Sequence, residues 1–285
     1  MRLLVTGATG LLGRQLLRST DHQAEHEVVP AYHSERVPGG VQLDIRRRDQ
    51  VRDVIRSVRP DGIIHTAYRQ DDWATTALGA VNVALAADGA RLVFVSTDAV
   101  FGPRKIAYRE HEQPCPITPY GAAKAAAETT IQALASDAVI ARTSLIVGSD
   151  GRSEEEQRVR RLAAGEPGAF YTGNIRCPVH VADLASALIE LLMSDVNGIT
   201  HVAGPEALSR LELGRLIAIR DGINPEALPS IPGEPSDIQL DCHRTQSILK
   251  TRIRPATEFL AVGTSAARQE VYHRGDRRQA GRDSS

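Results

Sequence analysis

Two side chains that could move a proton and hold a charge, Tyr120 and Lys124, lie four residues apart. The alanine-rich segment around them, YGAAKAAAETTIQAL, predicts a helix from about residue 120 to 134, so both side chains should project from one face. A neighbouring ammonium makes a phenol more acidic because it stabilises the phenolate. The pair could therefore protonate the alkoxide that forms when a hydride reaches a carbonyl carbon.

A third polar group, Thr97, should face this pair. It lies in Ser96-Thr97-Asp98, directly after the apolar run RLVFV, and parallel strands of an open sheet bind ligands at their carboxyl ends. Its hydroxyl would hydrogen-bond the carbonyl oxygen and stabilise the developing negative charge. We predict Thr97, Tyr120 and Lys124 as catalytic residues, with Lys124 also holding the nicotinamide ribose. Further predicted contacts are Ser96 and Tyr120 for the cofactor and Thr97, Asp98, Val100 and Leu145 for the substrate.

Three glycines at a spacing of three residues, Gly7, Gly10 and Gly13, join the first predicted strand to the first predicted helix. Glycines at such a turn let the pyrophosphate of a dinucleotide approach the amides of the helix N-terminus and let the helix pack on the strand. The turn therefore predicts a dinucleotide site, with Gly7, Thr9, Gly10 and Gly13 among its contacts.

The elements that must position these residues alternate between short β-branched runs and amphipathic stretches. This alternation indicates an α/β protein with a doubly wound, parallel Rossmann sheet of six or seven strands and a smaller C-terminal α/β substrate lobe. We expect the dinucleotide-binding domain in residues 1–150, with returning elements within 175–205, and most of the lobe in 151–262. Residues 263–285 are polar and basic, which predicts a disordered tail. Ser209 and Glu212 predict a capping box.

Composition excludes several classes of function. The 285 residues carry 34 Lys and Arg against 35 Asp and Glu, a formal net charge of −1, which lacks the basic signature of a nucleic-acid-binding protein. We found neither an apolar run long enough to span a membrane nor a signal peptide, so we expect a cytoplasmic protein. The three cysteines lack the spacing of a disulfide framework or zinc site, and no metal site is predicted.

The choice of cofactor depends on residues about 20 positions after the glycines. This chain has His33, Ser34, Glu35 and Arg36 there. Hydroxyl and basic groups can donate to a 2′-phosphate, so His33, Ser34 and Arg36 favour NADP, while Glu35 leaves NAD open. Arg36 could equally be a solvated loop charge.

Taken together, these residues resemble the extended short-chain dehydrogenase/reductase family and, within it, the dTDP-4-dehydrorhamnose reductase group. The resemblance covers roughly residues 1 to 260 and rests on segments in family order such as TGATGLLG, RPDGIIHTA, VSTDAVFGP, YGAAKAAAE, ARTSLIVG and RCPVHVADLASAL. It implies reduction of a nucleotide-linked 4-keto-6-deoxy sugar, with Tyr120 as the proton donor beside Thr97 and Lys124. It also implies that the cofactor is lined by Gly10, Leu11, Leu12, Asp44, Ile45, Ala67 and Tyr68.

Two features admit a second interpretation from the residues alone. Asp44 follows an apolar strand, so it could accept a hydrogen bond from the adenine amine or cap the helix that follows. The histidines at positions 65 and 180 lie beside apolar runs without companions that could ligate a metal, so we expect packed or hydrogen-bonded roles for them.

Departures from the reductase pattern concern the substrate. The rhamnose-forming reductases have aromatic residues where this chain has Ala99 and Leu145, so a different sugar or another, smaller ketone is compatible with the sequence. The chain also resembles the regulatory beta subunit of methionine adenosyltransferase in HTAYRQDD, RCPVHVAD and IQLDCHRTQ. A regulatory NADP-binding subunit and a nucleotide-sugar epimerase therefore stay open as alternatives, and a homodimer is compatible with either.

Overall fold

The structure is a computed structural model, and it describes residues 1–20, 26–233 and 236–261. The tail predicted for residues 263–285 lies outside the described residues. Within the described residues, no helix is long and apolar enough to cross a membrane.

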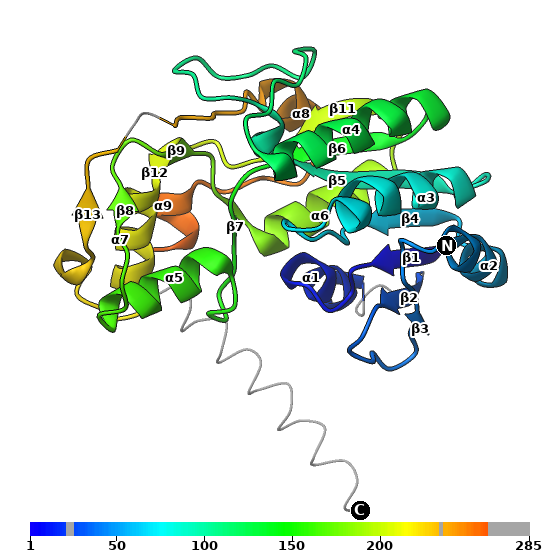
Figure 1. Cartoon of the computed structure of the whole chain (residues 1–285), viewed down its shortest axis with the longest axis horizontal. Coiled ribbons are helices and arrows are strands. Elements are labelled where there is room, and N and C mark those ends of the chain that lie inside the picture. The colour runs from blue at the N-terminus through cyan, green and yellow to red at the C-terminus, as the bar shows by residue number, and fades with distance from the viewer. Residues whose placement is uncertain (21–25, 234–235, 262–285) are drawn as a thin grey trace, which may run out of the picture.

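A parallel sheet of seven strands forms the centre of the described chain, which confirms the predicted fold class (Figure 1). Its first strand, β1 (Arg2–Thr6), lies between β4 and β2, the point at which the order of the strands reverses. Ligands bind outside the carboxyl ends of strands at such a point. From one edge to the other the strands are β11 (Gly198–His201), β6 (Val139–Thr143), β5 (Arg91–Thr97), β4 (Gly62–His65), β1, β2 (Glu27–Tyr32) and β3 (Val41–Gln42).

Helices cover both faces of this sheet. On one face α1 (Leu11–Thr20) packs against α6 (Val181–Leu192), and their apolar side chains form one core with β1, β4, β5 and β6. A second core lies on the opposite face. It is covered by α2 (Arg48–Val58), α3 (Gly79–Ala86) and α4 (Pro119–Leu134).

The helix that carries Tyr120 and Lys124 closely follows its predicted range. The helix predicted from 120 to 134 begins one residue earlier, at Pro119, because Thr118 caps it by accepting a hydrogen bond from the Gly121 amide at 3.0 Å. A π-helix, η1 (Ala74–Leu78), precedes α3 and continues directly into it. Gly79 at this junction packs closely on Ile45, whose side chain lies 2.6 Å from the position that a Cβ would take.

The remaining elements form the smaller lobe and its connections (Figure 1). The lobe core joins α5 (Glu154–Ala163), α7 (Arg210–Arg220) and α9 (Ala256–Phe259). The predicted capping box at Ser209 and Glu212 is confirmed, and Ser153 with Glu156 forms another on α5. Short elements complete the described chain: η2 (Asp98–Val100), β7 (Ile146–Val147), β8 (Phe170–Tyr171), β9 (Ile175–Arg176), β10 (Val179–His180), β12 (Leu208–Ser209), η3 (Pro225–Ala227), β13 (Ser230–Ile231) and α8 (His243–Ile248).

The turn between β1 and α1 depends on close contact between backbone atoms. Gly7 has a φ of +69°, in the left-handed region that favours glycine. A Cβ on Gly13 would lie 2.2 Å from the Gly7 carbonyl oxygen and 2.8 Å from Ala8 Cα, whereas one on Gly10 would lie 3.2 Å from its nearest neighbour. Gly13 therefore allows the first turn of α1 to rest directly on the turn.

We expect Gly13→Ala to lower the free energy of unfolding by about 1–3 kcal/mol, because the added methyl group must push the helix off the backbone beneath it. Urea denaturation of the purified variant measures this loss. The matched control, Gly10→Ala, should cost less because its Cβ needs only a small adjustment. Equal losses in the two variants would contradict this account of the turn.

Candidate active site

A cavity of about 330 Å³ lies at the carboxyl ends of β1, β2 and β4. It borders the turn between β1 and α1, the place where the sequence predicts a dinucleotide. Eight of the predicted cofactor residues line it: Gly7, Thr9, Gly10, His33, Asp44, Ile45, Ala67 and Tyr68. Its other lining residues, which sequence reasoning missed, are Thr6, Ala31, Leu43, Arg46, Thr66, Arg69 and Thr75.

The backbone of this cavity suits a pyrophosphate. The helix α1 begins at Leu11, so the free amides of its first turn lie beside the glycines. A Cβ on Gly7 would lie 2.8 Å from the Ala67 backbone nitrogen, which shows how closely the two loops approach. Leu12 is buried in the core with α6, so only its backbone is placed to meet a ligand. The residues present therefore fit a dinucleotide.

Arg46 holds the carboxylate of Asp44 at the rim of the cavity. Its guanidinium donates to both oxygens of Asp44, at 2.9 and 2.8 Å, and its backbone amide donates at 3.1 Å. These bonds lower the pKa of Asp44 to about 2, so it stays ionised. The alternative in which Asp44 caps the next helix is wrong, because the residue at the cap of α2 is Arg47. The arginine two residues after Asp44 in the sequence was the available signal for this pair.

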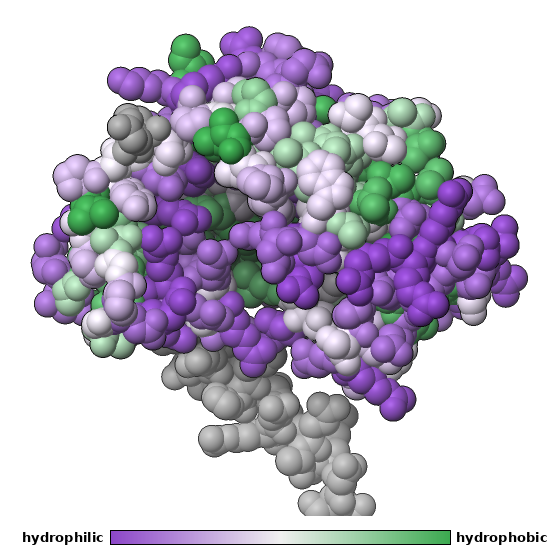
Figure 2. All heavy atoms as spheres, viewed as in Figure 1, coloured by the Kyte–Doolittle hydropathy of each residue, from purple (hydrophilic) through white to green (hydrophobic). Residues whose placement is uncertain are grey.

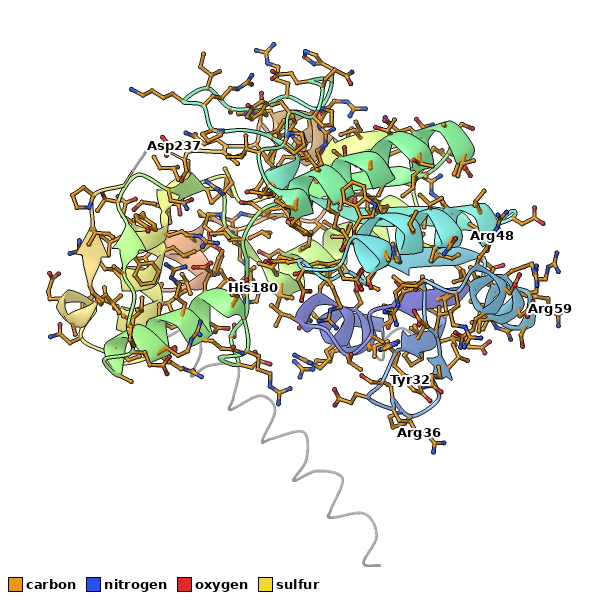
Figure 3. All side chains as sticks on the ribbon, viewed as in Figure 1. Tyr32, Arg36, Arg48, Arg59, His180 and Asp237 are labelled. Carbon is orange, nitrogen blue, oxygen red and sulfur yellow. The ribbon has the colours of Figure 1, made fainter. Side chains whose placement is uncertain are left out.

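Ser34 and Arg36 lie on the exposed loop after β2 and do not line the cavity. Figure 3 shows Arg36 at the edge of the molecule, on the far side of this loop from the sheet. Arg36 forms no ion pair with any described residue, whereas His33 lies 3.8 Å from the Asp44 carboxylate. Arg46, which was not predicted, is the cation nearest to this carboxylate in the described chain.

Lys124 lies beneath the site with only 2% of its surface exposed. Its ammonium donates to the Val95 carbonyl oxygen at 2.8 Å and lies 4.6 and 5.1 Å from the ring centres of Phe94 and Tyr68. Burial lowers its pKa to about 7, and the Glu128 carboxylate acts in the opposite direction. Burial also lowers the pKa of the nearby His65 to about 3, so this histidine is neutral.

Tyr120 stands one turn of α4 before Lys124, beside Thr97. Burial is the main cause that raises the pKa of Tyr120, followed by the Tyr68 phenol, while a side-chain hydrogen bond with Thr97 lowers it. The rings of Tyr68 and Tyr120 are 5.6 Å apart. Gly121 permits this arrangement because a Cβ there would lie 2.0 Å from the Ala99 carbonyl oxygen. The structure thus brings together the three residues predicted as catalytic.

The other predicted contacts near β5 have different surroundings. Ser96 is buried and its hydroxyl donates to Glu128 at 2.5 Å. Asp98 is also buried, accepts from Ser144 at 2.6 Å and lies 3.6 Å from Arg176. The side chain of Val100 is fully buried in a small core. Leu145 is partly buried against the core of the lobe.

Between the lobe and the sheet the surface is hollowed, with apolar side chains in its depth and hydrophilic ones around the rim (Figure 2). Within the described residues no group of three or more His, Cys, Asp or Glu side chains could hold a metal ion.

Comparison with known proteins agrees with this geometry. The model of the RmlD substrate binding domain family matches residues 1–262. A dTDP-4-dehydrorhamnose reductase of Mycolicibacterium smegmatis is 33% identical, with 93% of this chain and 85% of that protein covered. The methionine adenosyltransferase 2 subunit beta of Danio rerio is 29% identical, with 86% of this chain and 84% of that protein covered.

A solved structure has the same fold and carries a dinucleotide. It is the dTDP-4-dehydrorhamnose reductase of Bacillus anthracis in complex with NADP. It superposes with a TM-score of 0.78 at 28% identity, over 91% of this chain and 96% of that chain.

The lowered pKa of Lys124 predicts a dependence of stability on pH. The unfolded chain keeps this side chain protonated up to the ordinary pKa of 10.5, whereas the folded chain releases the proton near pH 7. Between these values the unfolded state binds more protons, so the free energy of unfolding should rise with pH. From about pH 7 to 9 we expect a gain of about 2 kcal/mol.

Urea denaturation at several pH values, without cofactor, measures this gain. Lys124→Met is the control, since it removes the titrating group and should remove that part of the slope. The comparison ends near pH 9 because the raised pKa of Cys242 makes stability fall above its ordinary value of 9.0. If the free energy of unfolding changes with pH equally in the wild type and in Lys124→Met, Lys124 titrates outside this range.

Proposed function

Because this chain belongs to the family of the RmlD substrate binding domain, we propose that it is an NADP-dependent reductase of a nucleotide-linked 4-keto-6-deoxy sugar. The resemblance to extended short-chain dehydrogenases/reductases, drawn from the sequence, is confirmed. The observation that carries the proposal is the meeting of Thr97, Tyr120 and Lys124 at the carboxyl end of β5. The reductase relatives supply the substrate class.

Each of these three residues has one task in the proposed reaction. When bound, the cofactor supplies the hydride to the carbonyl carbon. The Thr97 hydroxyl would donate a hydrogen bond to the carbonyl oxygen. Tyr120 would give that oxygen its phenolic proton as the ketone becomes an alcohol. Lys124 provides the positive charge that favours proton loss from Tyr120 and donates to the nicotinamide ribose.

The cofactor would lie across the cavity at β1, β2 and β4. We assign the pyrophosphate to the glycine turn and the amides of α1, and the adenine end to Asp44, Ile45, Ala67 and Tyr68. Cofactor choice would rest on basic and hydroxyl groups near the adenosine ribose, where Arg46 joins the predicted His33, Ser34 and Arg36. The NADP complex of the Bacillus anthracis reductase supports NADP, and NAD complexes of more distant structures support NAD as a second cofactor.

The substrate would enter the hollow between sheet and lobe. We propose residues 1–150, with the elements returning from 175–205, as the dinucleotide-binding domain, and most of 151–262 as the substrate lobe. Of the predicted contacts, Thr97 is the one assigned to the reacting oxygen. We assign Asp98 and Leu145 to the substrate side of the site as well, whereas the side chain of Val100 is fully buried in a small core.

Assembly and location are also part of the proposal. Figure 2 shows hydrophobic side chains over the region of α3 and α4, where Leu78, Leu85 and Leu134 are exposed. This surface suits a homodimer. We place the protein in the cytoplasm, without a nucleic-acid or membrane partner.

A second candidate function comes from the methionine adenosyltransferase 2 subunit beta proteins among the relatives. In that case the chain would be a regulatory subunit that binds NADP without catalysing reduction. A nucleotide-sugar epimerase is a further candidate, since such enzymes share the fold.

Tyr120→Phe separates the reductase from the regulatory subunit. With NADPH and a dTDP-4-keto-6-deoxy sugar, we expect the variant to lose about 10²- to 10⁴-fold in kcat, because it lacks the proton donor. Loss of absorbance of the reduced nicotinamide measures turnover. Fluorescence titration measures NADPH binding, which should weaken by about tenfold at most, because the variant loses no more than one predicted hydrogen bond to the cofactor. NADPH binding by the wild type without turnover of any ketone would refute the reductase and favour the regulatory role.

Arg36→Ala tests the proposed preference for the 2′-phosphate. We expect NADPH to bind about tenfold more weakly while the affinity for NADH stays unchanged, because one charge-assisted hydrogen bond is lost. The control is Arg56→Ala, which removes an exposed cation from the last turn of α2. If Arg36→Ala weakens neither cofactor, Arg36 is a solvated loop charge and Arg46 becomes the residue to test.

A further inference from the structure

Glu128 occupies a buried position directly behind the catalytic residues. It lies on α4 one turn after Lys124, and only 1% of its surface is exposed. One carboxylate oxygen accepts from the Ser96 hydroxyl at 2.5 Å. The guanidinium of Arg142, which is fully buried on β6, donates to both oxygens at 2.7–3.1 Å. The Glu128 carboxylate is thus buried within the protein, beside the end of β5.

These contacts join segments that are distant in the sequence. Ser96 precedes Thr97 on β5, Arg142 belongs to β6, and Glu128 belongs to α4. Arg142 also lies over the Phe101 ring, 4.8 Å from its centre, and contacts the carbonyl oxygens of Glu110 and Glu112 at 3.4 Å. Because Ser96 and Glu128 bond directly, they determine which turn of α4 stands against the end of β5.

Such an ion pair needs a reason beyond stability. Removing two charges from water costs several kcal/mol per ion, and apolar residues in their place are often as stable or more so. Glu128 also lies one turn after Lys124 on α4, and residues four apart on a helix are neighbours, with about 5–6 Å between their Cβ atoms. Glu128 is the acidic group that raises the pKa of Lys124.

The other groups that face Lys124 carry no negative charge in the relevant range. His65 on β4 is neutral at neutral pH. Tyr68 and Tyr120 both have pKa values raised above the ordinary 10.0 by burial, so they are protonated. Glu128 therefore supplies the negative charge that offsets the cost of keeping Lys124 charged in a buried place.

We propose that Glu128 is a positioning residue, which fixes α4 against β5 through Ser96 and Arg142 and serves as the counter-charge of the Lys124 ammonium. Glu128 touches neither substrate nor cofactor in this assignment. It acts through Lys124, which the proposed function places on the nicotinamide ribose, so the inference rests on that function for its catalytic consequence.

Glu128→Gln should lower the pH at which Lys124 loses its proton. NADPH binding, followed by fluorescence between about pH 6 and 9, should then weaken at a lower pH than in the wild type. We expect about tenfold weaker binding at about pH 8 and less than about twofold at about pH 6, which corresponds to a shift of about one pH unit. Urea denaturation should show the Lys124-dependent rise in stability beginning at a correspondingly lower pH.

The matched control is Arg142→Gln, which breaks the same ion pair from the other side. It leaves the Glu128 carboxylate in place and removes a positive charge, so NADPH binding should not weaken at a lower pH. A purely structural ion pair would make both variants lose stability without separating them in pH. Equal, pH-independent weakening in both variants therefore overturns the proposal.

A double variant, Glu128→Gln with Arg142→Met, keeps the test readable if Glu128→Gln does not fold, because it leaves no buried cation unpaired. In this double variant NADPH binding should also weaken at a lower pH than in the wild type. If the double variant folds and its NADPH binding has the same pH dependence as the wild type, the proposal is overturned as well. Failure of the proposed function is a different result. In that case the wild type binds NADPH but reduces no ketone, and the pH dependence of binding still reports on Glu128.

Discussion

The active site depends on keeping an ammonium group buried. An isolated charge in a protein interior is costly, and the neighbours of Lys124 offset part of the cost of burying its ammonium. A backbone carbonyl oxygen accepts from it, aromatic faces lie beside it, and a carboxylate lies one helical turn away. These partners come from β5, from the segment after β4 and from α4, so all three must be in place before the charge is stable.

The second constraint is close approach between backbones. Gly13 lets α1 rest on the turn after β1, and Gly121 lets α4 rest on the segment after β5. Both contacts leave no room for a side chain, and each presents the beginning of a helix to the edge of the sheet where ligands bind. Gly13 thus allows the close packing beside the proposed cofactor site, and Gly121 allows the same kind of packing beside Thr97 and Tyr120.

Local patterns in the sequence were sufficient for the glycine turn, for α4 with Tyr120 and Lys124, and for the parallel sheet. They failed where a role depends on partners distant in the sequence. Ser96 was placed on the cofactor, yet its hydroxyl bonds to Glu128, which is 32 positions away. Arg142 gave no local signal, because a lone arginine inside the apolar strand VIART has its partner on another element. Helical periodicity also did not encode the π-helix at Ala74–Leu78 or the close contact of Gly79 with Ile45.

The position of β1 also affects how the chain can reach its native state during synthesis. β1 lies inside the sheet, between β4 and β2, and the apolar face of α1 is covered by α6, which is synthesised much later. Until then Leu12 and Leu16 have no native neighbours from α6, and the nascent chain must be kept from aggregating. A fragment that ends at residue 150 would therefore expose the apolar side chains of α1 and of the sheet against which α6 packs.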